Sequence, residues 1–256
     1  MPKLNIRRFD PTQMRTNTTA MDIGKRGNGK STIVKDIMYN LRDKFHFGIH
    51  ISPTEDSNGQ MQGVMPRACI YTSFDDSIVT RSLNFQKKVS RGGGQQRNIF
   101  ISTDDCMFDP KTLKGKGVRE GFMNGRHRNI FLINAVQYMM DIPSGLRGQI
   151  DYVFATRDNI ISQRDKLWRY FFGMFADFRD FSAVMDQCTE GFNCIVIDNT
   201  IRTNNPEECI FWYNANPDLP SFRLCDSVYW NLDKKYFAER DDDDDTDVNI
   251  FTVARV

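Results

Sequence analysis

The glycine-rich segment at residues 24–32, which reads GKRGNGKST, constrains the fold of this chain more strongly than any other feature. It fits the pattern GxxxxGKS/T of a phosphate-binding loop, which works only between a strand and a helix. Residues 18–23 before it are β-prone, and residues 31–45 after it carry apolar side chains at helical spacing. The segment predicts a nucleoside triphosphate site, and the competing interpretation is a glycine-rich turn that only caps a helix.

The residues of this loop have separate expected roles. Glycines permit the positive φ angles that let successive backbone N–H groups turn inward around phosphates. Lys30 is expected to reach the β- and γ-phosphates, and Ser31 to ligate Mg²⁺. The predicted nucleotide-binding residues are Gly24, Gly27, Asn28, Gly29, Lys30, Ser31 and Thr32.

A second motif is an apolar strand that ends in two acids. Residues 98–103 form the expected strand, and Asp104 and Asp105 follow it. A strand end of this kind delivers a carboxylate to the metal beside a phosphate loop. We assign Asp104 to Mg²⁺, directly or through water, and Asp105 to polarising the attacking water. The alternative is a strand that ends in an ordinary polar turn.

A further strand, residues 129–134, is flanked by two candidate residues. Gln137 follows it and is placed to hydrogen-bond a phosphate oxygen or water near the γ-phosphate. Arg126 and Arg128 precede it, on the opposite edge from the strand's own nucleotide. An arginine there can enter a neighbouring subunit's site and stabilise transition-state charge. On spacing alone, two surface arginines in a loop are an equal alternative.

Local charge is concentrated in two places. Residues 111–128 form a glycine-interrupted basic segment, expected to be a flexible loop that contacts a phosphate backbone or is simply solvated. Residues 241–245 are all aspartate and are expected to be a solvated stretch. The basic residues of the first segment are Lys111, Lys114, Lys116, Arg119, Arg126 and Arg128.

Short apolar runs alternate with helical segments along the chain. Further strands are expected at residues 45–51, 151–155 and 193–198, with a long aromatic helix at 165–185 whose stripe favours core packing over a base-stacking platform. The pattern predicts an α/β fold with a mostly parallel central sheet and helices on both faces. We expect an N-terminal arm at residues 1–17, one ATPase domain at 18–232 and a C-terminal tail at 233–256.

Composition narrows the alternatives. Lys plus Arg number 34 and Asp plus Glu 33, so any surface for nucleic acid must be local. The six cysteines include no CxxC pair, which argues against a zinc site and a disulfide framework and favours a reducing compartment. Each of His46, His50 and His127 is expected to be structural. No apolar stretch of transmembrane length or secretory leader is evident, so we expect no membrane span.

Together these motifs resemble the DNA-packaging ATPases of large double-stranded DNA viruses, the poxvirus-type branch of the FtsK/HerA superfamily of P-loop NTPases. The resemblance covers about residues 18–230 and rests on GKRGNGKST, IFISTDD, GRHRNIFLINAVQ, the aromatic WRYFFGMFADF run, NCIVIDN and FWYNA. It implies a RecA-like fold, Arg126 as an arginine finger and Gln137 as a sensor. Many members of the superfamily have Glu where this chain has Asp105.

The resemblance also implies cofactors and partners. These are ATP with Mg²⁺, a homo-oligomeric ring of five or six subunits, double-stranded DNA, and a capsid or portal-vertex protein. The expected location is the assembly site in the infected host cell cytoplasm, or the virion. Two other functions stay open from the residues alone: a P-loop kinase, and a nucleotide-dependent switch or scaffold protein of assembly.

Overall fold

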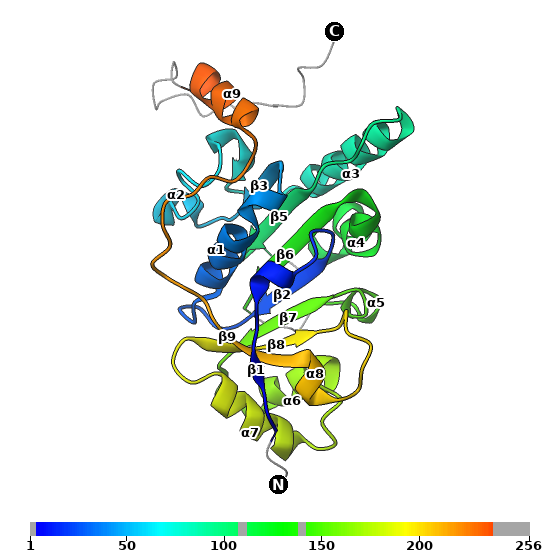
Figure 1. The fold of residues 1–256 in the computed structure, drawn as a ribbon, viewed down its shortest axis with the longest axis vertical. Helices are drawn as coiled ribbons and strands as arrows, with labels where there is room; N and C mark the ends of the chain where they lie inside the picture. The colour runs from blue at the N-terminus through cyan, green and yellow to red at the C-terminus, as the bar shows by residue number, and fades with distance from the viewer. Residues whose placement is uncertain (1–3, 107–111, 138–141, 238–256) are drawn as a thin grey trace.

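The computed structural model describes residues 4–106, 112–137 and 142–237. Within them, one sheet has the strand order β1-β9-β8-β7-β2-β6-β5-β3-β4 (Figure 1). The strands are β1 Arg7–Arg8, β2 Thr19–Ile23, β3 Phe47–Ile51, β4 Ile70–Tyr71, β5 Ile99–Asp104, β6 Ile130–Val136, β7 Tyr152–Thr156, β8 Asn193–Asp198 and β9 Ile210–Asn214.

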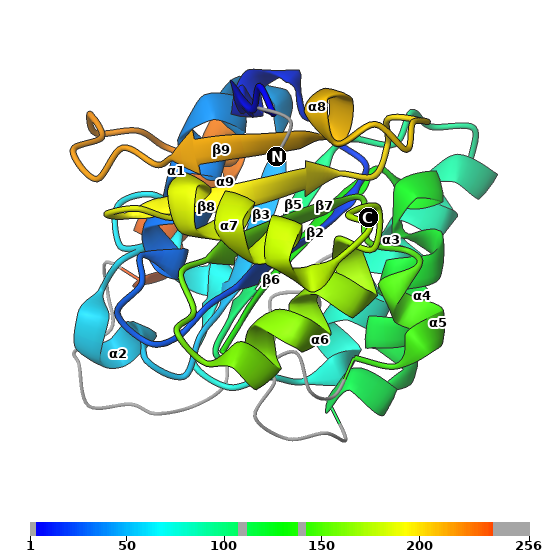
Figure 2. The same ribbon diagram turned by 90° about the horizontal axis from the view of Figure 1, so that it is seen from below.

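Helices cover both faces of the sheet, and Figure 2 shows α1 and the α3–α4 pair on opposite sides of the strands. One buried core lies between the sheet and α1, and the other between the sheet and α3, α4, α6 and α7. The α-helices in the described ranges are α1 Lys30–Leu41, α2 Glu55–Asn58, α3 Asp76–Arg91, α4 Lys116–Asn124, α5 Ser144–Arg147, α6 Ile161–Phe171, α7 Phe178–Cys188, α8 Pro206–Cys209 and α9 Ser227–Phe237.

The sheet is mostly parallel, which confirms the predicted fold class. The central strands β7, β2, β6, β5 and β3 all run in one direction. Among the strands of the described residues, only β8 is reversed, and it pairs antiparallel with both β7 and β9. The carboxyl ends of β2, β5 and β6 therefore meet at one edge, where a ligand site of an open α/β sheet is expected.

The aromatic segment at residues 165–185 is two helices, so the prediction of one continuous helix was wrong. The break between α6 and α7 contains Gly173, and Asp177 begins α7 by accepting a hydrogen bond from the Asp180 backbone N–H at 2.9 Å. Phe172 and Phe181 are fully buried on either side of the break. This burial confirms core packing for the buried members of the stripe, whereas Tyr170 is 41% exposed.

The basic segment is also more ordered than expected. Residues 116–124 form α4 instead of a flexible loop, because the carboxylate of Asp76 on α3 accepts the backbone N–H groups of Gly117 and Val118 at 2.8 and 2.9 Å. Lys111 and the acidic run at 241–245 lie outside the described residues.

Three short strands, β1, β4 and β9, were not predicted. Residue 232, the expected end of the ATPase domain, lies inside α9. Across the described ranges, no helix is both long and apolar enough to cross a lipid bilayer.

Candidate nucleotide-binding site

The predicted phosphate-binding loop joins the buried strand β2 to the start of α1. Gly27 and Gly29 have φ angles of 81° and 84°, which only glycine adopts without strain. Gly29 is the N-cap of α1, and no side chain caps the helix. The first N–H groups of α1 are thus available to an anion, the arrangement that binds phosphate at a helix N-terminus.

The loop is held in shape by the end of β7 and the connection that follows it. The side-chain amide of Asn28 donates to the Thr156 hydroxyl at 3.3 Å and to the Arg157 carbonyl at 2.8 Å. A Cβ atom at Gly24 would lie 1.9 Å from the Thr156 hydroxyl oxygen, so only glycine fits there. These contacts preorganise the loop for phosphate.

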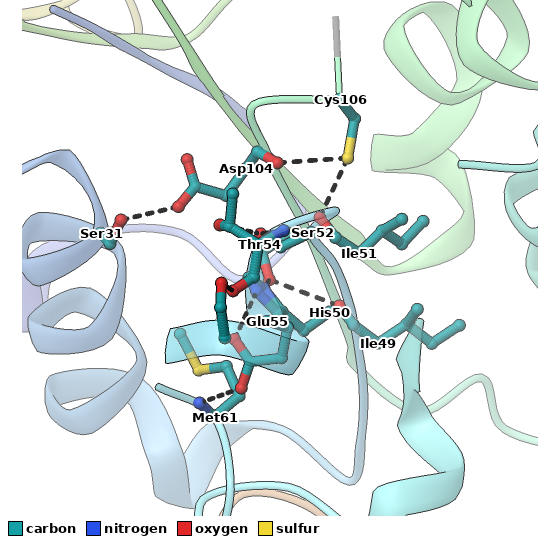
Figure 3. A network of polar contacts seen from close by, with 12 residues as sticks. Ser31, Ile49, His50, Ile51, Ser52, Thr54, Glu55, Met61, Asp104 and Cys106 are labelled. Atoms are coloured by element: carbon teal, nitrogen blue, oxygen red, sulfur yellow. Dashed lines mark hydrogen bonds and ion pairs between the residues drawn. The ribbon is translucent and has the colours of Figure 1, made fainter. Parts of the chain in front are cut away.

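Ser31 and Asp104, predicted as metal ligands from different motifs, lie together. The Ser31 hydroxyl donates to a carboxylate oxygen of Asp104 at 2.6 Å (Figure 3). Burial raises the pKa of Asp104, and the Ser31 hydrogen bond opposes that shift. A hydroxyl and a carboxylate are the hard oxygen donors that Mg²⁺ prefers, so this pair fits the ion.

Asp105 and Gln137 form the second contact across β5 and β6. The Gln137 amide donates to one carboxylate oxygen of Asp105 at 2.9 Å. The other oxygen is buried and has no hydrogen-bond partner among the described residues. Asp105 also has a φ of 51°, an uncommon value for a residue other than glycine. The amide therefore orients this carboxylate, whose other oxygen has the capacity for a further hydrogen bond.

Asp22 is a site residue that the sequence reasoning missed. It lies inside β2, is fully buried, and neither carboxylate oxygen has a hydrogen-bond partner in the described part of the chain. Burial raises the pKa of Asp22 well above its usual value, while the Lys30 ammonium opposes the shift and Asp104 reinforces it. The signal in the sequence was an acid inside the otherwise apolar strand that leads into the loop.

Lys30 is more enclosed than a surface lysine. Lys30 is only 6% exposed, and its ammonium group donates a hydrogen bond to the Lys25 carbonyl at 3.3 Å. The charge thus lies at the base of the phosphate loop, close enough to Asp22 and Asp104 to alter the pKa of each carboxyl.

A buried polar network supports this edge of the sheet from the end of β3 (Figure 3). His50 lies 2.8 Å from the Ser102 hydroxyl and 3.7 Å from the carboxylate of Glu55, which accepts the Met61 N–H at 2.6 Å. Burial lowers the pKa of His50 to about 4, so the imidazole is neutral at physiological pH. His50 thus has contacts of a structural kind, as expected.

Arg126 lies at the amino end of β6, on the edge of the sheet opposite the phosphate loop. Its guanidinium forms an ion pair with Asp151 at 2.9 Å, and Asp151 also accepts the Thr19 N–H at 3.0 Å. Arg147, an alternative finger, has its guanidinium 3.8 Å from the centroid of the Tyr170 ring. Arg126 therefore does not reach its own chain's loop.

These features define a P-loop NTPase fold. Genome packaging NTPase B204 from Sulfolobus turreted icosahedral virus 2, in complex with AMP, matches it with a TM-score of 0.56 and 16% identity, covering 80% of this chain and 100% of that chain. The DNA-packaging ATPase B204 from Sulfolobus Turreted Icosahedral Virus gives 0.55 and 14% over 79% and 100% of the two chains. The motif-based resemblance to viral packaging ATPases is confirmed at the level of fold.

The chain belongs to the family of viral proteins that includes uncharacterized protein 015R of Frog virus 3 (isolate Goorha). The two are 33% identical over 226 residues, which are 84% of this chain and 70% of that protein. Uncharacterized protein L437 of Acanthamoeba polyphaga mimivirus is 29% identical over 244 residues, 92% of this chain and 85% of that protein. No family model matches the chain.

Proposed function

We propose that the protein is an ATPase motor that translocates double-stranded viral DNA into preformed capsids. The observation that carries the proposal is that the two carboxylates at the end of β5 each contact another predicted site residue: Asp104 contacts Ser31, and Asp105 contacts Gln137. In this proposal, Asp104 and Ser31 bind the metal beside the phosphates. Asp105 and Gln137 position the attacking water, and Gln137 senses whether the γ-phosphate is present. The packaging NTPases that share the fold support this direction.

Each residue has a chemical role in this proposal. The loop N–H groups and Lys30 bind and orient the phosphates. Ser31 and Asp104 would hold Mg²⁺, which when bound supplies positive charge to the phosphate oxygens. Asp105 would accept a hydrogen bond from the attacking water, and Gln137 fixes the orientation of that carboxylate. Since Asp is one methylene shorter than Glu, water is expected to bind close to the strand end.

The assembly is proposed from the position of Arg126. Because it lies on the edge opposite its own loop, we propose that it completes a neighbour's site. The ring of five or six identical subunits is proposed from the resemblance to packaging ATPases. The further proposed partners are double-stranded DNA and a capsid or portal-vertex protein. The proposed location is the assembly site in the infected host cell cytoplasm, or the virion.

The DNA contact is proposed on the basic segment around α4. Lys114, Lys116 and Arg119 are exposed there. Their charges would contact the phosphate backbone without reading sequence. Neutralising all three is expected to weaken binding similarly for all DNA sequences and to flatten the log–log salt dependence by roughly 0.9 per lost contact.

DNA-stimulated ATP hydrolysis tests the proposed function. The wild type is expected to hydrolyse ATP with Mg²⁺, faster with double-stranded DNA, and Lys30→Ala to lose about 100-fold or more of that activity with an unchanged circular dichroism spectrum. The matched control is Lys88→Ala, an exposed lysine on α3. Wild-type turnover in a folded Lys30→Ala protein would contradict the phosphate-loop assignment.

The same assay separates the two alternatives. A P-loop kinase would transfer the phosphate to an acceptor and show little hydrolysis without one. A switch or scaffold protein would hydrolyse ATP at a rate that DNA does not change. Either result would replace the motor in this proposal.

A further inference from the structure

An exposed aromatic side chain lies beside the phosphate loop. Phe192, in the connection between α7 and β8, is 73% exposed. Its ring is 3.8 Å from the position that a Cβ atom on Gly29 would occupy. Gly191, directly before it, has a φ of 67°, so a glycine turn brings the ring to this place. An exposed phenylalanine beside a phosphate loop is placed to contact a ligand with an apolar face.

The reversed direction of β8 places Phe192 at the same end of the sheet as the phosphate loop. Because β8 is antiparallel to β7, its first residues lie at the carboxyl end of β7, and Cys194 pairs with Thr156. Phe192 lies in the turn directly before β8, whose residues Cys194 and Val196 are buried in the core beneath α1. Its ring lies near Gly29, the N-cap of α1, and is therefore on the face of the sheet that carries the loop and α1.

A nucleoside triphosphate bound across the carboxyl ends of the strands has its γ-phosphate and its nucleoside on different sides of the loop. The phosphate loop follows β2, and in the sheet β6 lies between β2 and β5. The γ-phosphate end belongs near Asp104, at the end of β5. The nucleoside end must leave on the other side of β2, where β7 and β8 lie. Phe192 is at the start of β8, so its position matches the nucleoside end.

We propose that Phe192 stacks against the base of the bound nucleotide and contributes the affinity that distinguishes a nucleotide from a bare polyphosphate. This inference rests on the proposed function, because it assumes that the loop binds a nucleoside triphosphate. Every base has a π-face, so stacking selects for a purine or pyrimidine ring without reading its hydrogen-bonding edge. Phe192 therefore favours nucleotides over inorganic phosphates and discriminates weakly between ATP and GTP.

Calorimetric titration of Phe192→Ala with Mg-ATP and with Mg-tripolyphosphate tests this role. Since stacking on an aromatic side chain accounts for roughly a 5- to 100-fold change in affinity, ATP binding is expected to weaken by that factor and tripolyphosphate binding to stay unchanged. Phe192→Tyr keeps the ring and is expected to retain ATP affinity. The matched control is Phe85→Ala, a 50% exposed phenylalanine on α3.

A second variant gives a readout independent of affinity. Phe192→Trp is expected to show fluorescence quenched by ATP and unaffected by tripolyphosphate, after subtraction of the parent signal from its three tryptophans. The stacking role is overturned if Phe192→Ala binds ATP as tightly as the wild type, or if it changes only the oligomeric state. A wild type that binds neither ATP nor tripolyphosphate contradicts the proposed function instead.

Discussion

Asp104 and Asp105 are adjacent in the chain, yet each is held by a different partner. Asp104 lies against Ser31 at the start of α1, and Asp105 turns through a positive φ to meet Gln137 at the end of β6. The uncommon backbone angle directs the two carboxylates to separate partners. Strain of this kind is often found at functional sites because the surrounding contacts stabilise it.

The two carboxylates are accordingly expected to fail differently when changed. Asp104→Ala should lose Mg²⁺-dependent ATP binding. Asp105→Asn should still bind ATP while its hydrolysis rate falls about 100-fold, because an amide accepts a proton poorly. Nucleotide titration with and without Mg²⁺, alongside single-turnover hydrolysis, measures both effects. Normal binding and turnover in both variants would mean that the pair is structural.

Asp22 makes stability depend on pH. Burial raises its pKa above the value of about 3.9 in an unfolded chain, so the folded protein holds a proton that the unfolded chain releases. This carboxyl therefore lowers the free energy of unfolding progressively as pH rises from about 4 through the folded pKa. Asp22→Asn removes the titration, and its melting temperature is expected to fall less than that of the wild type between pH 5 and 7.5.

Thermal unfolding followed by circular dichroism across that pH range measures the difference. Asp43→Asn, at a carboxylate with 87% of its side chain exposed, is the matched control and should parallel the wild type. If Asp22→Asn also gives a curve parallel to that of the wild type, Asp22 stays ionised in the folded protein, balanced by Lys30.

The elements that were predicted best are those with a contiguous sequence motif. The phosphate loop is one continuous segment, and two acidic residues mark the end of β5, so both could be located from the sequence. The direction of β8 could not be predicted, because a buried apolar run reads the same in either direction. Asp22 was missed for a related reason: its burial depends on packing from α1 and neighbouring strands. The break between α6 and α7 could have been predicted from Gly173, because glycine disfavours a helix interior.

The junction of α3 and α4 gives a prediction at the element scale. Gly115, the N-cap of α4, has no side chain to satisfy the first N–H groups, and Asp76 of α3 accepts them instead. Asp76→Ala leaves these donors unsatisfied and is expected to lower the free energy of unfolding by about 1–3 kcal/mol. Urea denaturation measures this, and Asp76→Asn, which keeps one acceptor oxygen, should lose less. Equal stability of all three proteins would show that water replaces Asp76.

For the whole molecule, the decisive question is whether one subunit completes the site of the next. Arg126→Ala and Lys30→Ala proteins should each be inactive alone, since one lacks the finger and the other the phosphate lysine. Mixed in equal amounts, they should regain some ATPase activity, because a fraction of interfaces then pairs an intact loop with an intact arginine. Turnover measured at concentrations where the wild type assembles tests this. Full activity of Arg126→Ala alone would exclude Arg126 as the finger and point to Arg128 or Arg147.

The two-residue strand β1 has a consequence for aggregation. Its backbone pairs with β9, and the Arg7 and Arg8 guanidinium groups lie 5.5 and 5.8 Å from the ring centroids of Phe211 and Trp212. An uncovered β9 would present an apolar, aromatic strand edge to other copies of the chain, a template for open-ended strand pairing. Because the sheet ends in a short strand with two positive charges, like-charge repulsion is expected to disfavour such pairing between copies of the chain.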